Sequence, residues 1–217
     1  MERPARLAGW LALVSLLITL AYVSRATEGK PDPQVLYRWS TAVGGIVQDG
    51  IILIVVLALA GFDRRLLGLR RPRSITQALR LLGSAIVLIY IFEVTYSALT
   101  NPGNEQGLTP SRWEPAHASA YVVNGIVICT FIPFVEELTY RGLGYSLLEG
   151  LGRWPAIVAV GVLFGLAHGL IVSLPVIAVF GMVLTWIRAV TRSVFPGMLL
   201  HALFNLIALV AAVTING

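Results

Sequence analysis

Seven apolar runs dominate this chain of 217 residues, and they constrain its fold more than any other feature. A helix that crosses a bilayer needs about 20 apolar residues, with roughly 17 to 25 tolerated when it tilts. Five runs, of 18 to 22 residues, fit this length comfortably, the run 7–23 is at its lower limit, and the run 174–187 is short. We therefore predict one all-α domain over residues 1–217, a polytopic transmembrane bundle of about six to eight helices. The runs cover residues 7–23, 42–62, 78–99, 118–135, 154–172, 174–187 and 196–213.

The overall composition agrees with a membrane protein. Hydrophobic residues make up 57% of the chain and charged residues only 12%, about half the charged fraction of a soluble domain. No small-x-small cleavage pattern follows the first run, so we expect a retained helix there rather than a secretory signal. Cys129 is the single cysteine, which excludes a disulfide framework, and we expect it to be a buried packing residue.

Arginine residues indicate how the chain is oriented in the membrane. A net charge of +5 would suggest a nucleic-acid partner for a soluble domain, but cytoplasmic loops of membrane proteins carry an excess of Arg and Lys. The loop 63–77 is rich in Arg, so we expect it in the cytoplasm together with the N-terminus. The prediction is a multi-pass protein of a bacterial inner (plasma) membrane. Loops 24–40 and 100–117 then lie outside, and Arg153, Arg188 and Arg192 lie on the inner side.

Three polar motifs interrupt the apolar runs in the second half of the chain. Ionisable side chains in membrane segments are costly, and they usually face a bundle interior, a partner or a water-filled cavity. We therefore expect the motifs to form one active site inside the bundle. They are Glu136-Glu137-Leu138-Thr139-Tyr140-Arg141, Phe164-Gly165-Leu166-Ala167-His168 and His201-Ala202-Leu203-Phe204-Asn205.

Helical spacing organises each motif, because residues four apart share a face. Glu137 and Arg141 form such a pair in the favourable order, so we expect Arg141 to neutralise Glu137. Glu136 is rotated by about 100° from Glu137, which leaves it on another face beside Tyr140. The other two motifs place Phe164 with His168 and His201 with Asn205.

A turn at 150–153 makes the glutamate-bearing segment and the next run a hairpin. Glu136 lies about 15 residues before this turn and His168 about 16 after it, so at 1.5 Å per residue both lie roughly 22–25 Å from it. We therefore predict that Glu136 and His168 meet at one depth. Pro133 is expected to kink the helix near the carboxylates.

The depth of His201 does not fit this scheme. His201 is only five residues after Pro196, about 8 Å into its helix. If the loop 190–195 lay level with Gly152, His201 would be too shallow to meet Glu136. Either the turn at 150–153 projects beyond the membrane, or the helices are strongly tilted or broken.

These side chains suit the attack of water on a carbonyl. A carboxylate in an apolar site can be the general base, a role that we assign to Glu136, with His168 orienting the water or sharing the proton. The developing oxyanion needs preorganised donors, which His201 and the amide of Asn205 can supply. We expect the Glu137–Arg141 pair to fix the position of the helix and the local charge. Phe164 is expected to shape the pocket by packing, and Tyr140 to lie beside Glu136.

The three motifs resemble those of the CPBP family of intramembrane proteases, also called the type II CAAX prenyl endopeptidase or Abi family (CAAX proteases and bacteriocin-processing enzymes). The family pattern is EExxxR, FxxxH and HxxxN or HxxxD, and residues 118–208 match it at every motif position. The resemblance implies a glutamic-type endopeptidase with Glu136 and His168 catalytic and His201 and Asn205 on the oxyanion. The family was formerly described as metalloproteases, whereas the later picture needs no cofactor.

Several alternatives remain open at this point. Zinc proteases usually carry HExxH, which is missing here, but Glu136, His168 and His201 could still form a three-ligand zinc site. A bacteriocin-immunity or membrane scaffold protein would use the same cavity only for binding. A small transporter would use Glu136, Glu93 and the histidines as a proton relay.

For a protease, the expected partners are the lipid bilayer and a membrane-anchored protein or peptide, not nucleic acid. The substrate could be a prenylated C-terminal tail, a C-terminal sorting helix of an exported protein, or the leader of a secreted bacteriocin. Among the other polar residues of the runs, we expect Glu93 to line the cavity or pair with a buried donor. Gln48 and Asp49 are expected at the membrane interface.

Overall fold

The structure is a computed structural model that describes residues 2–29, 32–105, 110 and 113–215. Lys30 and part of the expected outer loop 100–117 lie outside the described residues. Within these residues every regular element is helical, and six segments are long and apolar enough to cross a membrane. The prediction of an all-α polytopic membrane bundle is therefore confirmed. The six segments are α1 (Arg3–Glu28), α2 (Trp39–Ala60), α3 (Ile75–Thr100), a continuous helical segment over Pro115–Leu151, α8 (Leu174–Thr191) and α9 (Phe195–Ile215).

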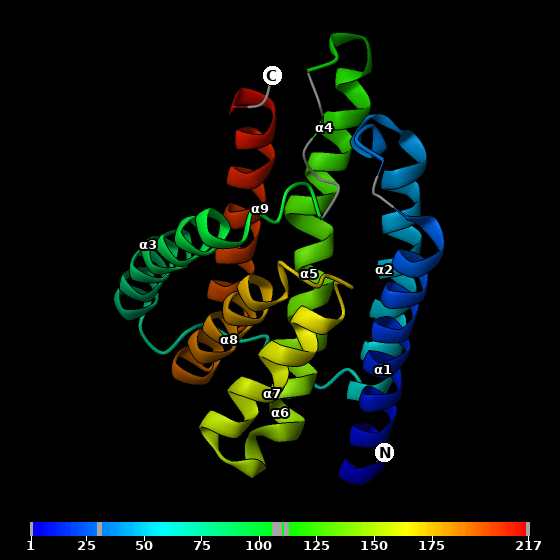
Figure 1. Ribbon diagram of the computed structural model, residues 1–217. Coiled ribbons are helices and arrows are strands. Elements are labelled where there is room, and N and C mark those ends of the chain that lie inside the picture. Colours follow the sequence, from blue (N-terminus) through cyan, green and yellow to red (C-terminus); the bar gives the residue numbers. More distant parts are fainter. Residues whose placement is uncertain (1, 30–31, 106–109, 111–112, 216–217) are drawn as a thin grey trace.

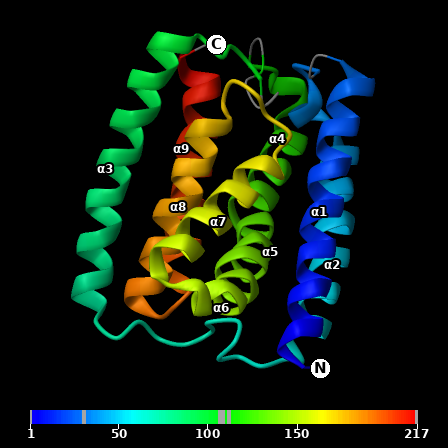
Figure 2. The ribbon, with the colours of Figure 1, turned by 60° about the horizontal axis from the view of Figure 1, so that its bottom comes forward.

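The helices are arranged around the segment that carries the two glutamates. Helices α1 and α2 lie side by side at one edge, and α3 lies at the other edge against α8 and α9 (Figures 1 and 2). The N-terminus is at one end of the bundle and the end of α9 at the opposite end (Figure 2). The loop between α2 and α3 crosses beneath the central helices at the N-terminal end.

The ends of the long helices follow from local sequence. Helix α2 ends at Gly61, which adopts the left-handed conformation with φ 63°. The Ser74 hydroxyl caps α3 by accepting the backbone N–H of Gln77 at 3.2 Å. Asn101, at φ 48°, ends α3 in the left-handed conformation that asparagine tolerates better than most residues.

The central segment is a single helix with two π-helical stretches on either side of Glu136. The kink expected at Pro133 takes the form of the first stretch, in which the Ile132 N–H bonds to the Val127 carbonyl, five residues back. The α-helical donor of the Ile128 carbonyl would be the Ile132 N–H, which bonds to Val127 instead. Its π-helical donor would be residue 133, a proline, which has no N–H. In order, the parts are η2 (Pro115–His117), α4 (Ala118–Ile126), the π-helix η3 (Val127–Phe131), α5 (Ile132–Glu136), the π-helix η4 (Glu137–Gly144), α6 (Tyr145–Leu148) and η5 (Glu149–Leu151).

The apolar run 154–172 does not form one membrane-spanning helix. Its helix, α7 (Arg153–Leu166), has 14 residues and so rises about 21 Å, which is shorter than the bilayer core. A turn follows in which Gly169 has φ 65°, and α8 then begins with a proline in its first turn. The run 174–187, which is short in sequence, instead becomes the 18-residue helix α8.

Glycines let α7 and α8 pack with their backbones in close contact. A Cβ at Gly161 would lie 2.6 Å from the backbone nitrogen of Met182, and one at Gly181 would lie 2.9 Å from the Gly161 carbonyl oxygen. Gly165 faces Ala178 in the same way. This spacing of small residues is the one that lets membrane helices approach closely, and it fixes the position of Phe164 on α7.

The loop after α2 explains how His201 reaches the glutamates. The backbone N–H of Val194 donates to the Gly68 carbonyl at 3.1 Å, and a Cβ at Gly142 would lie 2.8 Å from the Leu67 carbonyl oxygen. The loop before α9 therefore lies near the level of Gly142, not of Gly152. The turn at 150–153 therefore projects beyond that loop, whereas its position relative to the membrane stays a prediction.

Cys129 is a free thiol and is half-buried rather than fully buried. It packs against a small apolar cluster near one end of the bundle. The buried members of this cluster are Leu36, Tyr37, Tyr121 and Leu209.

We predict that Gly161→Ala destabilises the protein, because the added methyl group collides with the backbone of α8. Overpacking of this kind costs about 1–3 kcal/mol. Thermal unfolding in detergent should show a lower Tm. The control is Gly83→Ala in α3, where a Cβ meets nothing within 4 Å. Equal Tm values for the two variants would contradict the close approach of α7 and α8.

Candidate active site

Glu137 and Arg141 form an ion pair in the interior of the protein. Nη1 of Arg141 lies 3.0 Å from Oε1 of Glu137, and both side chains are 0% exposed. The guanidinium also donates from Nη2 to the Gly181 carbonyl of α8 at 3.1 Å. Its carbon lies 4.1 Å from the centre of the Phe164 ring. The expected pairing is present, and it joins the central helix to α7 and α8.

The start of α9 packs directly on the Glu137 carboxylate. A Cβ at Gly197 would lie only 2.5 Å from Oε2 of Glu137, so glycine is needed at this position. This close approach places the first turns of α9 against the glutamate pair. It brings His201, one turn further along α9, to the level of the two glutamates.

His201 lies between the two glutamates. Its Nδ1 is 3.3 Å from Oε1 of Glu137, and its Nε2 is 3.5 Å from Oε2 of Glu136. The imidazole is 4% exposed, whereas the Glu136 side chain is 23% exposed. Glu137 is thus held by Arg141 and His201, while Glu136 keeps an accessible carboxylate.

His168 is held by the end of its own helix. Its Nδ1 lies 2.8 Å from the Phe164 carbonyl oxygen, an oxygen that the last turn of α7 leaves without a helical partner. Because a carbonyl can only accept, Nδ1 must carry the proton in this contact. In the neutral ring, Nε2 is then an unprotonated acceptor.

Asn205 satisfies the carbonyl that Pro133 leaves without a donor. Its Nδ2 donates to the Ile128 carbonyl at 2.8 Å, which ties α9 to the π-helix η3. One of its two amide hydrogens is therefore committed to structure. The second hydrogen is what Asn205 can offer to a substrate.

Phe164 and Tyr140 fill the space between the charged groups. The Phe164 ring makes edge contacts with His168, His201 and Tyr140 at centroid distances of 4.6, 5.8 and 5.2 Å. Phe164 is 1% exposed, in agreement with a packing role. The Tyr140 hydroxyl is buried and has no hydrogen-bond partner among the described residues.

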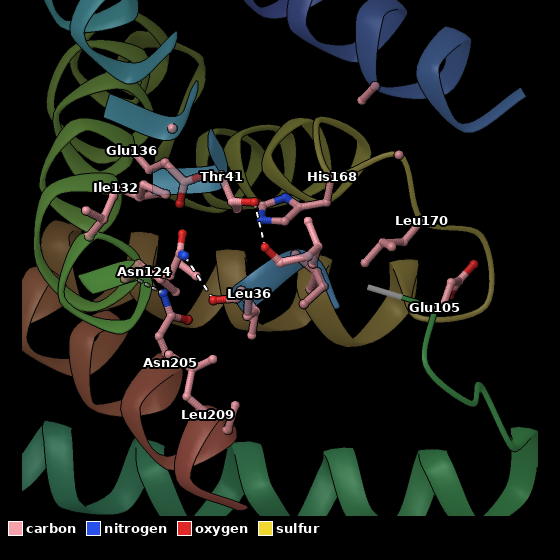
Figure 3. A pocket seen from close by; sticks show the side chains of 18 of the residues that line it. Leu36, Thr41, Glu105, Asn124, Ile132, Glu136, His168, Leu170, Asn205 and Leu209 are labelled. Carbon is pink, nitrogen blue, oxygen red and sulfur yellow. Dashed lines mark hydrogen bonds between the residues drawn. The ribbon is translucent and has the colours of Figure 1, made fainter. Parts of the chain in front are cut away.

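A cavity of about 810 Å³ brings the predicted site residues together. It is lined by Glu136, Phe164, His168, His201 and Asn205, so the predicted meeting of Glu136 and His168 is present. Figure 3 shows Glu136 and His168 facing a common space, with Asn205 across from them and Glu105 at the far end. Glu137 and Arg141 do not line this cavity and lie behind its wall.

Glu136 also lines a second, smaller cavity of about 470 Å³. Gln48, Asp49 and Tyr140 line it too. Gln48 is exposed, and its place at the interface stays a prediction. Asp49 lies in the middle of α2 and is 6% exposed, so the expectation that it is interfacial is wrong. An ionisable residue at the centre of an apolar run was the signal that could have revealed it.

Glu93 lines neither of these two cavities. Its Oε2 is buried and has no hydrogen-bond partner among the described residues. Both expectations for Glu93, a place in the cavity wall and a buried donor, are thus unsupported.

Glu105 holds the turn that follows His168. Its carboxylate accepts the backbone N–H groups of Ile171, Val172 and Ser173 at 2.8, 3.1 and 2.7 Å, and it pairs with Arg25 of α1 at 2.8 Å. Burial alone would raise the pKa of this carboxyl, but the hydrogen bonds outweigh it and lower the pKa to about 2. No sequence motif pointed to Glu105.

The proposed zinc ligands do not converge. Among the residues that the structure describes, no group of three or more His, Cys, Asp or Glu side chains could hold a metal ion. Glu136, His168 and His201 do not form such a group in this arrangement.

Comparison with known families agrees with the motifs. Residues 118–207 match the family model described as type II CAAX prenyl endopeptidase Rce1-like, and this segment contains all three motifs. The match confirms the predicted resemblance to this family over these residues. No curated protein and no solved structure matches the chain.

We predict that Arg141→Met strongly destabilises the protein, because it leaves the Glu137 charge buried without its main partner. Breaking such a pair costs about 3–5 kcal/mol. Denaturant unfolding in detergent measures the loss, with Arg153→Met as the control at an exposed position at the start of α7. A variant as stable as the control would show that Glu137 does not depend on Arg141.

We also predict that the contribution of Glu105 to stability depends on pH. Its folded pKa of about 2 lies below the ordinary 4.5, so the contribution is complete above pH 4.5 and is lost as the pH falls towards 2. The Tm difference between wild type and Glu105→Gln should therefore narrow on acidification. Glu114→Gln serves as the control, because Glu114 bonds to Gln34 and His117 rather than to this turn. A difference that is constant with pH would contradict the assignment.

Proposed function

We propose, from the membership of residues 118–207 in the type II CAAX prenyl endopeptidase Rce1-like family, that this chain is an intramembrane endopeptidase that cleaves a membrane-anchored protein or peptide. The family supports a protease, and hence a hydrolase, embedded in the membrane. One observation carries the proposal. The accessible carboxylate of Glu136 faces Nε2 of His201 at 3.5 Å and shares a cavity with His168.

In the first step, Glu136 acts as the general base. Its carboxylate removes a proton from a water molecule that Nε2 of His168 helps to orient. The water oxygen attacks the carbonyl carbon of the scissile peptide bond, and the π electrons move to the carbonyl oxygen. The donors for this oxyanion are the second amide hydrogen of Asn205 and Nε2–H of His201, whose ring carries a proton on both nitrogens because Nδ1 also donates to the Glu137 carboxylate.

In the second step, the tetrahedral intermediate collapses. The carbonyl double bond re-forms, the carbon–nitrogen bond breaks, and the leaving nitrogen takes the proton from Glu136. The products are a new carboxyl end and a new amino end, and Glu136 is again a carboxylate. Glu137 keeps His201 in place throughout, because it contacts the other ring nitrogen.

Only water and the side chains of Glu136, His168, His201 and Asn205 take part in this reaction. Metal analysis of active protein is the direct check on a cofactor-free, glutamic-type mechanism.

A binding protein or a transporter would also need the cavity, but not the pairing of a base with oxyanion donors. An immunity or scaffold protein should keep its function when Glu136 becomes Gln, which has almost the same shape. A transporter would lose uptake into vesicles without any change in the length of a substrate. These readouts separate the alternatives from proteolysis.

We predict that Glu136→Gln abolishes processing, since loss of a general base typically lowers the rate by about 10²–10⁴-fold. The measurement is mass spectrometry of the termini of membrane proteins and secreted peptides in native cells, at matched expression. A precursor should accumulate in the variant.

The matched control for this experiment is Glu93→Gln, which removes another membrane carboxylate but lies outside both cavities. It should process the precursor normally if it is expressed at the wild-type level. Unchanged termini in Glu136→Gln cells would argue against a protease and favour a binding role.

A further inference from the structure

The main cavity occupies only one end of the bundle. Its wall includes the end of α1 at Ser24 and Arg25, Glu105, the turn at Gly169 and the second half of α9 as far as Leu209. No lining residue comes from the loop 61–74, from the turn 149–153 or from the segment 188–194. The cavity reaches the surface near Arg38, whose side chain is 60% exposed.

The opposite side of the catalytic residues is closed by packed side chains. Directly behind Glu136, Leu138 is 1% exposed and Arg141 is 0% exposed. Below them, Leu67 of the loop after α2 is 1% exposed and lies against Gly142. A substrate can therefore approach Glu136 from the cavity end, and not through the end that holds the loop 61–74.

The two ends of the bundle differ in their charge. The closed end carries many arginines, and only a few acids lie near them. At the cavity end, Arg25 is paired with Glu105 and Arg38 is paired with Asp32. An excess of arginine marks the cytoplasmic side of a membrane protein, so the closed end is cytoplasmic. Its arginines are Arg3, Arg6, Arg64, Arg65, Arg70, Arg71, Arg73, Arg80, Arg153, Arg188 and Arg192.

We propose that the catalytic cavity opens to the extracytoplasmic side, and that the substrate is a membrane-anchored segment of an exported protein whose scissile bond reaches Glu136 from that side. The statement about the substrate rests on the proposed protease function. The statement about the opening rests on the cavity wall and the charges alone. A prenylated tail anchored on the cytoplasmic face has no route to Glu136 through the closed end.

Thiol accessibility tests the opening without any need for activity. In a Cys129→Ala, Glu136→Gln background, single cysteines replace two residues of the cavity wall, Ser24 and Ala208. Two orientation markers are Thr27→Cys at the exposed end of α1 and Arg64→Cys in the arginine-rich loop. A membrane-impermeant maleimide is applied to intact cells and, separately, to inside-out vesicles.

The expected result on intact cells is labelling of Ser24→Cys, Ala208→Cys and Thr27→Cys, with no labelling of Arg64→Cys. In inside-out vesicles only Arg64→Cys should be labelled. Cavity cysteines that react from the same side as Arg64→Cys would overturn the proposal. Labelling of Arg64→Cys from the outside would overturn the orientation on which it depends.

The survey of termini tests the substrate class. A precursor that accumulates in Glu136→Gln cells should carry its cleavage site on an exported segment, and a cytoplasmic site would overturn the inference. If labelling is as expected but no terminus changes, the protease function fails while the outward opening stands. The two failures are therefore distinguishable.

Discussion

The site depends on one buried ion pair. Burying the charges of Glu137 and Arg141 is costly, and the cost is offset only if each charge keeps close partners. Arg141 finds them in Glu137, the Gly181 carbonyl and the face of Phe164, which lie on three different helical elements. Since all three partners must be in place together, the pair fixes the central segment, α7 and α8 relative to one another.

The same pair separates two neighbouring glutamates by role. Glu137 is occupied by Arg141 and by Nδ1 of His201, so its charge serves to hold the site. Glu136, one position earlier, lines the cavity, and its Oε2 lies 3.5 Å from Nε2 of His201. Chemically identical side chains thus receive different environments from a rotation of about 100° around one helix.

The sequence predicted those features that depend on helical spacing. The pairing of Glu137 with Arg141 and the meeting of Glu136 and His168 at one cavity follow from residue counts along the helices, although Glu137 and Arg141 lie in the π-helix η4. The features that the sequence missed are the hydrogen-bond pattern next to Pro133 and contacts between residues that are distant in sequence. The π-helical turn before Pro133 changes the hydrogen-bond period, and the contact of Asp49 with the second cavity arises from packing of α2 against the central segment. The family match covers the motifs, but neither Asp49 nor Glu105 lies within it.

The shortness of α7 has a consequence for the supply of water. Its 14 residues rise about 21 Å, so if α7 begins at one boundary of a hydrocarbon core of about 30 Å and runs along its normal, the turn that follows lies about 9 Å inside the other boundary. Lipid next to such a short segment adapts by thinning. The Glu105 carboxylate and the hydroxyls of Tyr22 and Tyr96 satisfy the backbone of this turn, so it can lie at that depth. A local dent in the bilayer would bring the aqueous phase down to His168, and hydrolysis within the membrane would then need no pore.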